Sequence, residues 1–248
     1  MTRIYSPTQL SLFSISRLGA WWEEFEKAKR VLSFPEPTEL EKRLMLEGDN
    51  HEKMLMEKFR KEGKSIVDIG TLNLSTEDKF FKTIEFMKEG IDIISQGALK
   101  NKTIRGNADF LYRVEQTSNL GDWSYEPIEC KLSSKSKTTF LIQACCYCDL
   151  LENILGRKPK LFHLYLGGGS KLSDNIFKFS DFEDWYNQLK SQYKQFIDNF
   201  DPNREPDIFP GNHGKWTTFI ENELSRRKDL SLVAGMTKYQ RNRLIEQS

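Results

Sequence analysis

The chain has 248 residues, of which 38% are hydrophobic and 29% are charged, and its formal net charge is +1. This length and composition suit one or two domains with a hydrophobic core. The balanced charge excludes a global basic field, so any phosphate binding must come from a local patch. No apolar run is long enough to span a membrane, and the N-terminus lacks the apolar stretch of a secretory signal.

The first quarter of the chain predicts two helices. Apolar residues at helical spacing favour one helix over residues 6–31, and the prolines at positions 35 and 37 end it because proline cannot continue a helix. Thr38 and Glu41 form a capping box, which predicts a second helix to about Lys61. The inner stripe of this second helix is expected to contain Leu40, Leu44, Gly48, His51, Leu55 and Phe59.

The middle of the chain alternates predicted strands and helices. Strands are expected over 65–74, 91–99, 103–115, 125–132, 161–166 and 175–179. Helices are expected over 76–87, 138–155 and 180–199, with Gly90 and Gly156 as stop signals. The strand over 161–166 follows a helix, so we expect it to join the sheet in parallel.

This pattern predicts three parts. Residues 1–37 are expected to form a helical segment that packs on the core, and residues 38–200 an α/β core with a central mixed β-sheet flanked by helices. Residues 201–248 are expected to form a loop and a helical tail. A helical pattern is still developing where the chain stops, so we expect a further domain beyond Ser248.

The cysteines indicate a reducing compartment. Cys145, Cys146 and Cys148 crowd into one predicted helix, and the fourth cysteine is Cys130. Such crowding is no disulfide framework, so we expect a cytoplasmic protein. Cys145 and Cys148 lie one helical turn apart without the second pair that a metal site would need, so we expect them in the core.

Three residues in the predicted sheet carry the clearest chemical signal. Glu129 and Lys131 lie two apart in one strand and therefore share a face, and Asp109 lies in the preceding strand. If the strands pair, two carboxylates and one ammonium converge. A divalent cation relieves the repulsion between carboxylates, and their hard oxygens suit Mg²⁺ or Mn²⁺. A lysine beside such a cation can orient water or stabilise charge on a phosphate.

Four motifs together resemble the PD-(D/E)XK nuclease superfamily, and within it the RecB-like exonucleases. They are Gly-x-x-His-Glu at residues 48–52 (GDNHE), Gly-x-x-Asp at 106–109 (GNAD), Glu-x-Lys at 129–131 (ECK) and Gln-x-x-x-Tyr at 143–147 (QACCY). Each motif is weak alone. All four, in this order over residues 40–166, argue against a chance match.

The resemblance implies a restriction-endonuclease-like core of order αβββαβ, with additional N- and C-terminal helices. It implies a Mg²⁺- or Mn²⁺-dependent deoxyribonuclease, an exonuclease acting on single-stranded DNA or duplex ends in repair, recombination or defence. Metal ligation falls to His51, Asp109, Glu129 and the Cys130 carbonyl. Lys131 would act on the water or the phosphate.

Other residues are expected to contact the nucleic acid. Gln143 and Tyr147 share a helix face and would position the nucleic acid or the lysine. Arg105, Lys135 and Lys137, together with Lys102, form the expected phosphate-contacting patch, although they could equally be solvated loop residues.

The chain departs from the family in one respect. Many branch members hold an iron–sulfur cluster through cysteines near both ends, but residues 14–17 and 213–224 contain no cysteine. We expect no cluster, and other packing that joins the two ends. A helicase or an RNase H-like domain often accompanies similar domains, so either is an expected partner in the same pathway.

Each candidate residue also has an ordinary structural interpretation. A histidine on an apolar helix face is usually a hydrogen-bonded core residue, and an isolated Glu-x-Lys is usually a solvated strand edge. The chain could therefore be a nuclease-fold module that binds nucleic acid or a partner protein with little catalysis. It could also be a different phosphoesterase or a structural protein, which a sheet with non-adjacent strands for Asp109 and Glu129 would favour.

Overall fold

The computed structural model describes residues 3–29 and 38–247. The predicted proline break at 34–37, which also ends the predicted first part, lies outside these residues. Contacts divide the chain into two compact units, one within 1–11 and 34–191 and the other within 12–33 and 192–248. Two of the three boundaries between the units fall inside helices, α1 (Pro7–Ile15) and α6 (Glu183–Asp198).

The first unit is built on a six-stranded mixed sheet. Its strands are β1 (Ile66–Asp68), β2 (Ile93–Lys100), β3 (Arg105–Val114), β4 (Ser124–Lys131), β5 (Leu161–Leu166) and β6 (Ile176–Lys178). They lie in sequence order, with β1–β2 and β4–β5 parallel and the other neighbours antiparallel. The predicted α/β class and mixed sheet are confirmed, as is the parallel addition of β5. β1 is shorter than predicted because a turn begins at once, in which the Gly70 N–H bonds the Asp68 carboxylate.

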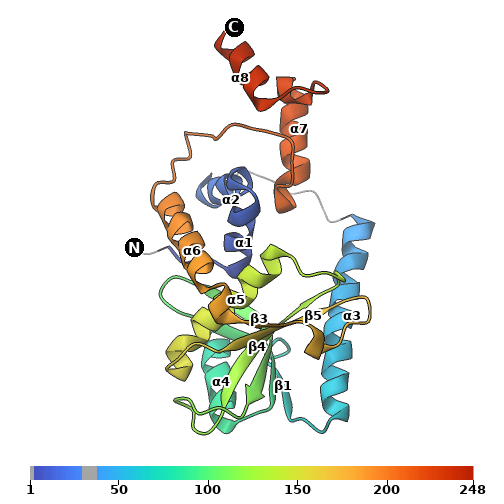
Figure 1. Cartoon of the computed structure of the whole chain (residues 1–248), viewed down its shortest axis with the longest axis vertical. Coiled ribbons are helices and arrows are strands. Elements are labelled where there is room, and N and C mark those ends of the chain that lie inside the picture. The colour runs from blue at the N-terminus through green and yellow to red at the C-terminus, as the bar shows by residue number, and fades with distance from the viewer. Residues whose placement is uncertain (1–2, 30–37, 248) are drawn as a thin grey trace. The chain divides into compact units, whose positions relative to one another are not determined.

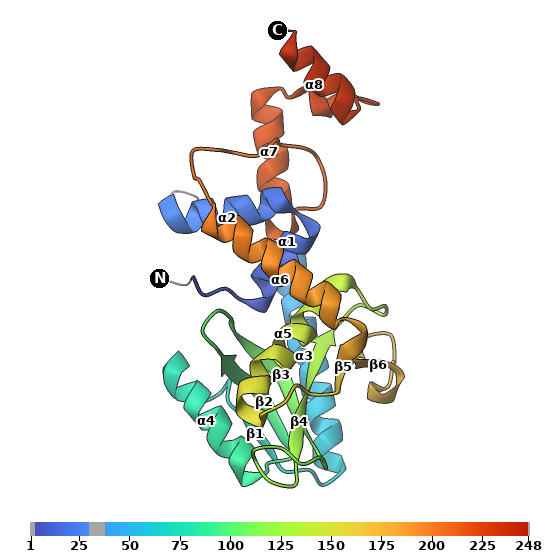
Figure 2. The same ribbon diagram turned by 60° about the vertical axis from the view of Figure 1, so that its left-hand side comes forward.

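Three helices flank this sheet. α3 (Glu39–Lys61) lies on one side, whereas α4 (Thr76–Glu89) and α5 (Thr138–Leu155) lie on the other (Figures 1 and 2). The predicted capping box is present at the start of α3, and the Ser75 side chain caps α4. Gly90 and Gly156 end their helices with φ of 75° and 74°, a left-handed conformation that glycine adopts without strain.

The packing of α3 is confined to its C-terminal half. Leu55, Met56 and Phe59 are buried against the sheet, in a cluster with residues of β2, β3 and β4. The predicted inner stripe is wrong for the N-terminal half, since Leu40 is 67% exposed and Leu44 is 52% exposed. The register of α3 on the sheet is therefore set by its last three turns.

The second unit joins the two ends of the chain. It contains α2 (Arg17–Lys29), α7 (Thr217–Arg227) and α8 (Lys238–Glu246). The helix expected over 6–31 is interrupted at Ser16, whose hydroxyl lies 2.6 Å from His213 Nδ1. Because His213 Nε2 must donate to the Phe209 carbonyl, its Nδ1 accepts from Ser16. Trp21, Trp22 and Trp216 pack beside this contact, so hydrogen bonding and aromatic packing join the ends.

Two further sequence expectations concern burial and hydropathy. All four cysteines are buried and unbridged, which confirms Cys145 and Cys148 as core residues. Within the described ranges, none of the helices combines the length and the apolar character that crossing a bilayer requires.

Candidate active site

A gap between two neighbouring strands forms the centre of the candidate site. β3 and β4 pair from Val114 opposite Ser124 to Phe110 opposite Ile128. The opposite edge of β4 pairs with β5 from Ile128 to Lys131, so only the β3 edge is left without pairing beyond that point. The Cys130 N–H instead donates to Asp109 Oδ2 at 2.7 Å, so this carboxylate lies between the separating strands.

Lys131 connects the two predicted carboxylates. Its ammonium forms an ion pair with Glu129 Oε1 and lies 3.9 Å from Asp109 Oδ2. The Glu129 side chain is only 2% exposed, and its Oε2 has no hydrogen-bond partner among the described residues. The structure therefore brings Asp109, Glu129 and Lys131 together, and leaves one buried carboxylate oxygen that needs a positive or donating partner.

A third carboxylate, which sequence reasoning did not select, joins this group. Glu52 on α3 accepts a hydrogen bond from Gln96 Nε2 at 2.9 Å, and its charge acts on Asp109 and Glu129. Its only sequence signal was its place beside His51 in the matched motif. Gln96 carried no sequence signal.

Burial and mutual repulsion raise the pKa of the acids. Burial, then repulsion by Asp109, raises the pKa of Glu129 to about 8 and that of Glu52 to about 7. Burial also raises the pKa of Asp109, against the opposing effects of Lys131 and the Cys130 N–H. For Lys131, burial alone would lower the pKa, but attraction to Glu129 and Asp109 raises it, so the lysine stays charged.

These residues suit a hard divalent cation. Asp109 and Glu129 lie beside the Lys131 ammonium, the charge of Glu52 acts on the same group, and the unpartnered Glu129 Oε2 supplies an oxygen. A strand residue turns its N–H and C=O to the same side, so the Cys130 carbonyl faces the gap as its N–H does. Over 3–29 and 38–247, however, no three His, Cys, Asp or Glu side chains are grouped tightly enough to form a ready-made metal centre. Binding Mg²⁺ or Mn²⁺ would require the side chains to shift.

His51 contacts β5. Its ring stacks on Tyr165 of β5, with centroids 4.5 Å apart, and its Nε2 lies 3.2 Å from the Tyr165 carbonyl. Tyr165 pairs with Cys130 in the sheet, so His51 is next to the site but directed at β5. In the motif at residues 48–52, Glu52 is the residue whose charge interacts with that of Asp109.

Gln143 and Tyr147 reach the N-terminal segment and β3 respectively. The Tyr147 hydroxyl donates to the Asn107 carbonyl at 2.7 Å, and burial raises its pKa well above the ordinary value, so it remains a donor. Gln143 Nε2 donates to Thr8 Oγ1 at 3.3 Å. Tyr147 therefore links α5 to β3 two residues from Asp109. Gln143 links α5 to Thr8 in α1.

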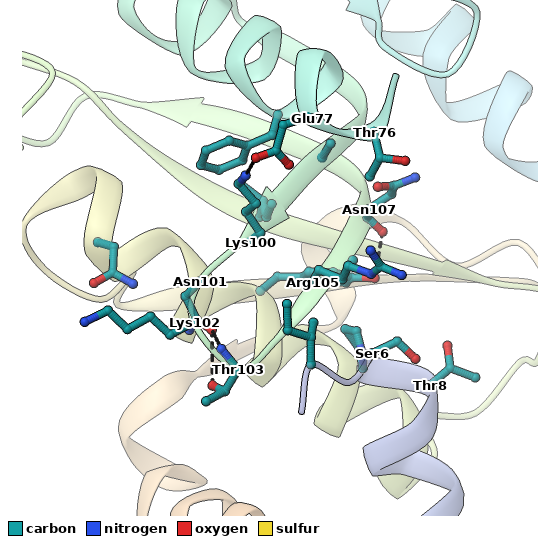
Figure 3. Close-up of a pocket in the computed structure, with 18 residues that line it drawn as sticks. Ser6, Thr8, Thr76, Glu77, Lys100, Asn101, Lys102, Thr103, Arg105 and Asn107 are labelled. Atoms are coloured by element: carbon teal, nitrogen blue, oxygen red, sulfur yellow. Dashed lines mark hydrogen bonds and ion pairs between the residues drawn. The ribbon is translucent and has the colours of Figure 1, made fainter. Parts of the chain in front are cut away.

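A groove of 1180 Å³ begins beside Tyr147 and Asn107 and extends between the N-terminal segment, the start of α4 and the β2–β3 turn (Figure 3). Glu77 pairs with Lys100 in its wall, so the excess positive charge comes from Lys102 and Arg105. Figure 3 shows these two side chains extending in different directions from the turn.

The predicted basic patch is divided between two places. Arg105 and Lys102 line the groove, whereas Lys135 and Lys137 lie on the loop before α5. Lys137 Nζ lies 5.7 Å from the centre of the Phe140 ring, and Lys131 Nζ lies 5.8 Å from the same centre. Lys131 and Lys137 therefore both lie near the Phe140 ring, and Lys135 and Lys137 are exposed.

Comparison with known proteins assigns the chain to no group: neither the family models nor the curated proteins contain a match.

The raised pKa of Glu129 predicts a pH-dependent stability. The unfolded side chain titrates near 4.5, whereas the folded one titrates at about 8. Its stabilising contribution is complete below pH 4.5 and is lost as the pH rises through 8. In EDTA, the melting temperature of the wild type should therefore fall more steeply between pH 5 and 9 than that of Glu129→Gln.

Glu115→Gln is the matched control for this prediction, since Glu115 lies just past the end of β3 with a side chain that is 75% exposed. Its melting curve should follow the wild type across the range. Equal slopes for the wild type and Glu129→Gln would contradict the raised pKa.

Proposed function

We propose that this protein is a Mg²⁺- or Mn²⁺-dependent nuclease that hydrolyses DNA phosphodiester bonds, an exonuclease of the RecB-like, PD-(D/E)XK kind. The observation that carries the proposal is the gap between β3 and β4, where Asp109, Glu129 and Lys131 converge and Glu129 Oε2 lacks a partner. β3 and β4 are neighbours in the sheet. Non-adjacent strands for Asp109 and Glu129 would have favoured a different phosphoesterase or a structural protein, and the described strands do not have that arrangement.

The chain supplies the ligands and an ammonium for this chemistry. Asp109, Glu129, the Cys130 carbonyl and Glu52 would hold the cation. When bound, such a cation lowers the pKa of water and polarises a phosphodiester. Lys131 would then leave Glu129, and its ammonium would orient a nucleophile or stabilise charge on the phosphate.

The groove supports a nucleic-acid substrate. A phosphodiester backbone is a polyanion, and Lys102 and Arg105 place positive charge along a path that reaches Tyr147 and Asn107 near the carboxylates. Lys137 adds a further positive charge next to the Phe140 ring, which also lies near Lys131. A strand bound in the groove would bring a phosphate toward the gap.

A nuclease-fold binding module is the second candidate. In the structure Lys131 is paired with Glu129, and His51 stacks on Tyr165. Both side chains already have protein partners, which favours a module without catalysis. Such a module would bind nucleic acid through the groove but would not cut it.

The nuclease proposal predicts cleavage that depends on the carboxylate gap. Labelled single-stranded and duplex DNA, incubated with Mn²⁺ or Mg²⁺, should be degraded by the wild type. Asp109→Asn and Lys131→Ala should each lower the rate by about 100-fold or more, because the first removes a ligand of the cation and the second removes a positive charge that stabilises the transition state. Asp122→Asn, an exposed acid on the β3–β4 loop, is the matched control and should cut normally. Cleavage undiminished in Lys131→Ala would contradict this role.

The groove predicts a salt-dependent affinity. In EDTA, a double variant of Lys102→Ala and Arg105→Ala should bind a single-stranded oligonucleotide more weakly. The slope of log affinity against log salt should fall by about 1.4, since each phosphate contact to a single strand contributes about 0.7. Fluorescence anisotropy measures both. The control removes two exposed lysines at the far end of α3, Lys58→Ala with Lys61→Ala. An equal loss in that control would show that binding follows net charge and not the groove.

A further inference from the structure

Gln96 has an unusual backbone for a strand residue. Its φ is 51°, in the left-handed region, although it lies in the middle of β2. The other non-glycine residue with positive φ in the described part of the chain is Lys228, which ends α7, where this conformation is common. Left-handed glutamine persists only where its surroundings determine it, and such strain often marks a functional position.

The irregular residue lies opposite Asp109. Ser95 pairs with Phe110 and Gly97 pairs with Ala108, but the register between them skips Gln96 and Asp109. The ladder is therefore interrupted on the β2 side of Asp109, just as pairing with β4 ends on its other side. Because strand pairing is interrupted on both sides, the backbone around Asp109 can depart from regular sheet geometry.

Close packing fixes the backbone on each side of Gln96. The Ile69 N–H donates to the Ser95 carbonyl at 3.0 Å. A Cβ at Gly97 would approach Leu111 Cδ1 to 2.7 Å, and one at Gly70 would approach Gln96 Cγ to 3.2 Å. The two glycines therefore allow neighbouring segments to pack closely around Gln96, and this packing directs its side chain.

The Gln96 side chain ends on a carboxylate. Its amide donates to Glu52 Oε2 at 2.9 Å, which ties a residue of the sheet to one of α3. Glu52 is the acid whose charge acts on both Asp109 and Glu129. Among the described residues the Gln96 amide is the one hydrogen-bond partner of this carboxylate, so its second oxygen can bind another group.

From this arrangement we propose that Gln96 is a positioning residue, which holds Glu52 as a further carboxylate ligand of the cation site at Asp109 and Glu129. The proposal rests on the proposed nuclease function. It assigns the left-handed conformation a purpose, because a regular strand residue at position 96 would not place its amide on Glu52 from a point opposite Asp109.

Calorimetric titration of the full chain with Mn²⁺ tests this without relying on cleavage. Gln96→Gly relieves the backbone but removes the amide. It should melt no lower than the wild type yet bind Mn²⁺ about tenfold more weakly, the usual effect of losing a residue that orients a metal ligand. Gln96→Asn, which tolerates the left-handed region but has a shorter side chain, should show the same loss. Lys228→Gly relieves the other left-handed residue and should bind Mn²⁺ as the wild type does.

A double variant shows whether Gln96 acts through Glu52. Glu52→Gln should weaken Mn²⁺ binding, and adding Gln96→Gly should weaken it no further. Unchanged Mn²⁺ affinity in Glu52→Gln, or in both Gln96 variants, would overturn the positioning role. If binding in that case is still abolished by Asp109→Asn, the nuclease proposal stands without it. A wild type that binds no Mn²⁺ would overturn both.

Discussion

The interaction on which the site depends is the burial of acidic side chains in a gap in the sheet. Moving an ion out of water costs several kcal/mol even after the protein relaxes, so buried carboxylates require compensation. The Cys130 N–H compensates Asp109, Lys131 compensates Glu129, and the Gln96 amide compensates Glu52. The compensation is incomplete, because Glu129 Oε2 has no described partner and the pKa values of the acids are raised.

The fold creates this gap where pairing stops on one edge of a strand. β4 pairs with β3 only over its first half, as far as Ile128, while its other edge pairs with β5 from Ile128 to Lys131. The β4–α5–β5 crossover keeps β5 parallel to β4, and Tyr147 ties α5 to β3 through the Asn107 carbonyl. Because each element is fixed by its neighbours, Asp109 and Glu129 are held close despite the repulsion that raises the pKa of Glu129.

Much of this arrangement could be predicted from local sequence. Strand alternation placed Glu129 and Lys131 on one face, and the sequence-order sheet brought Asp109 beside them. The capping box at Thr38 and the stop at Gly156 set helix ends because their signals lie within four residues. The rotation of α3 could not be predicted, since neighbouring helix residues differ by about 100° in direction. His51 and Glu52 are adjacent, and only tertiary packing decides which of them is coupled to Asp109. The left-handed Gln96 likewise depends on contacts with β1 and β3.

The central claim is that the gap between β3 and β4 binds a divalent cation. A crystal of the full chain grown with Mn²⁺, with data collected for anomalous scattering, tests it most directly. The account predicts a peak about 2.2 Å from oxygens of Asp109 and Glu129, with the Lys131 ammonium moved off Glu129. An ordered site in which Lys131 still pairs with Glu129, with no peak between the carboxylates at saturating Mn²⁺, would contradict it.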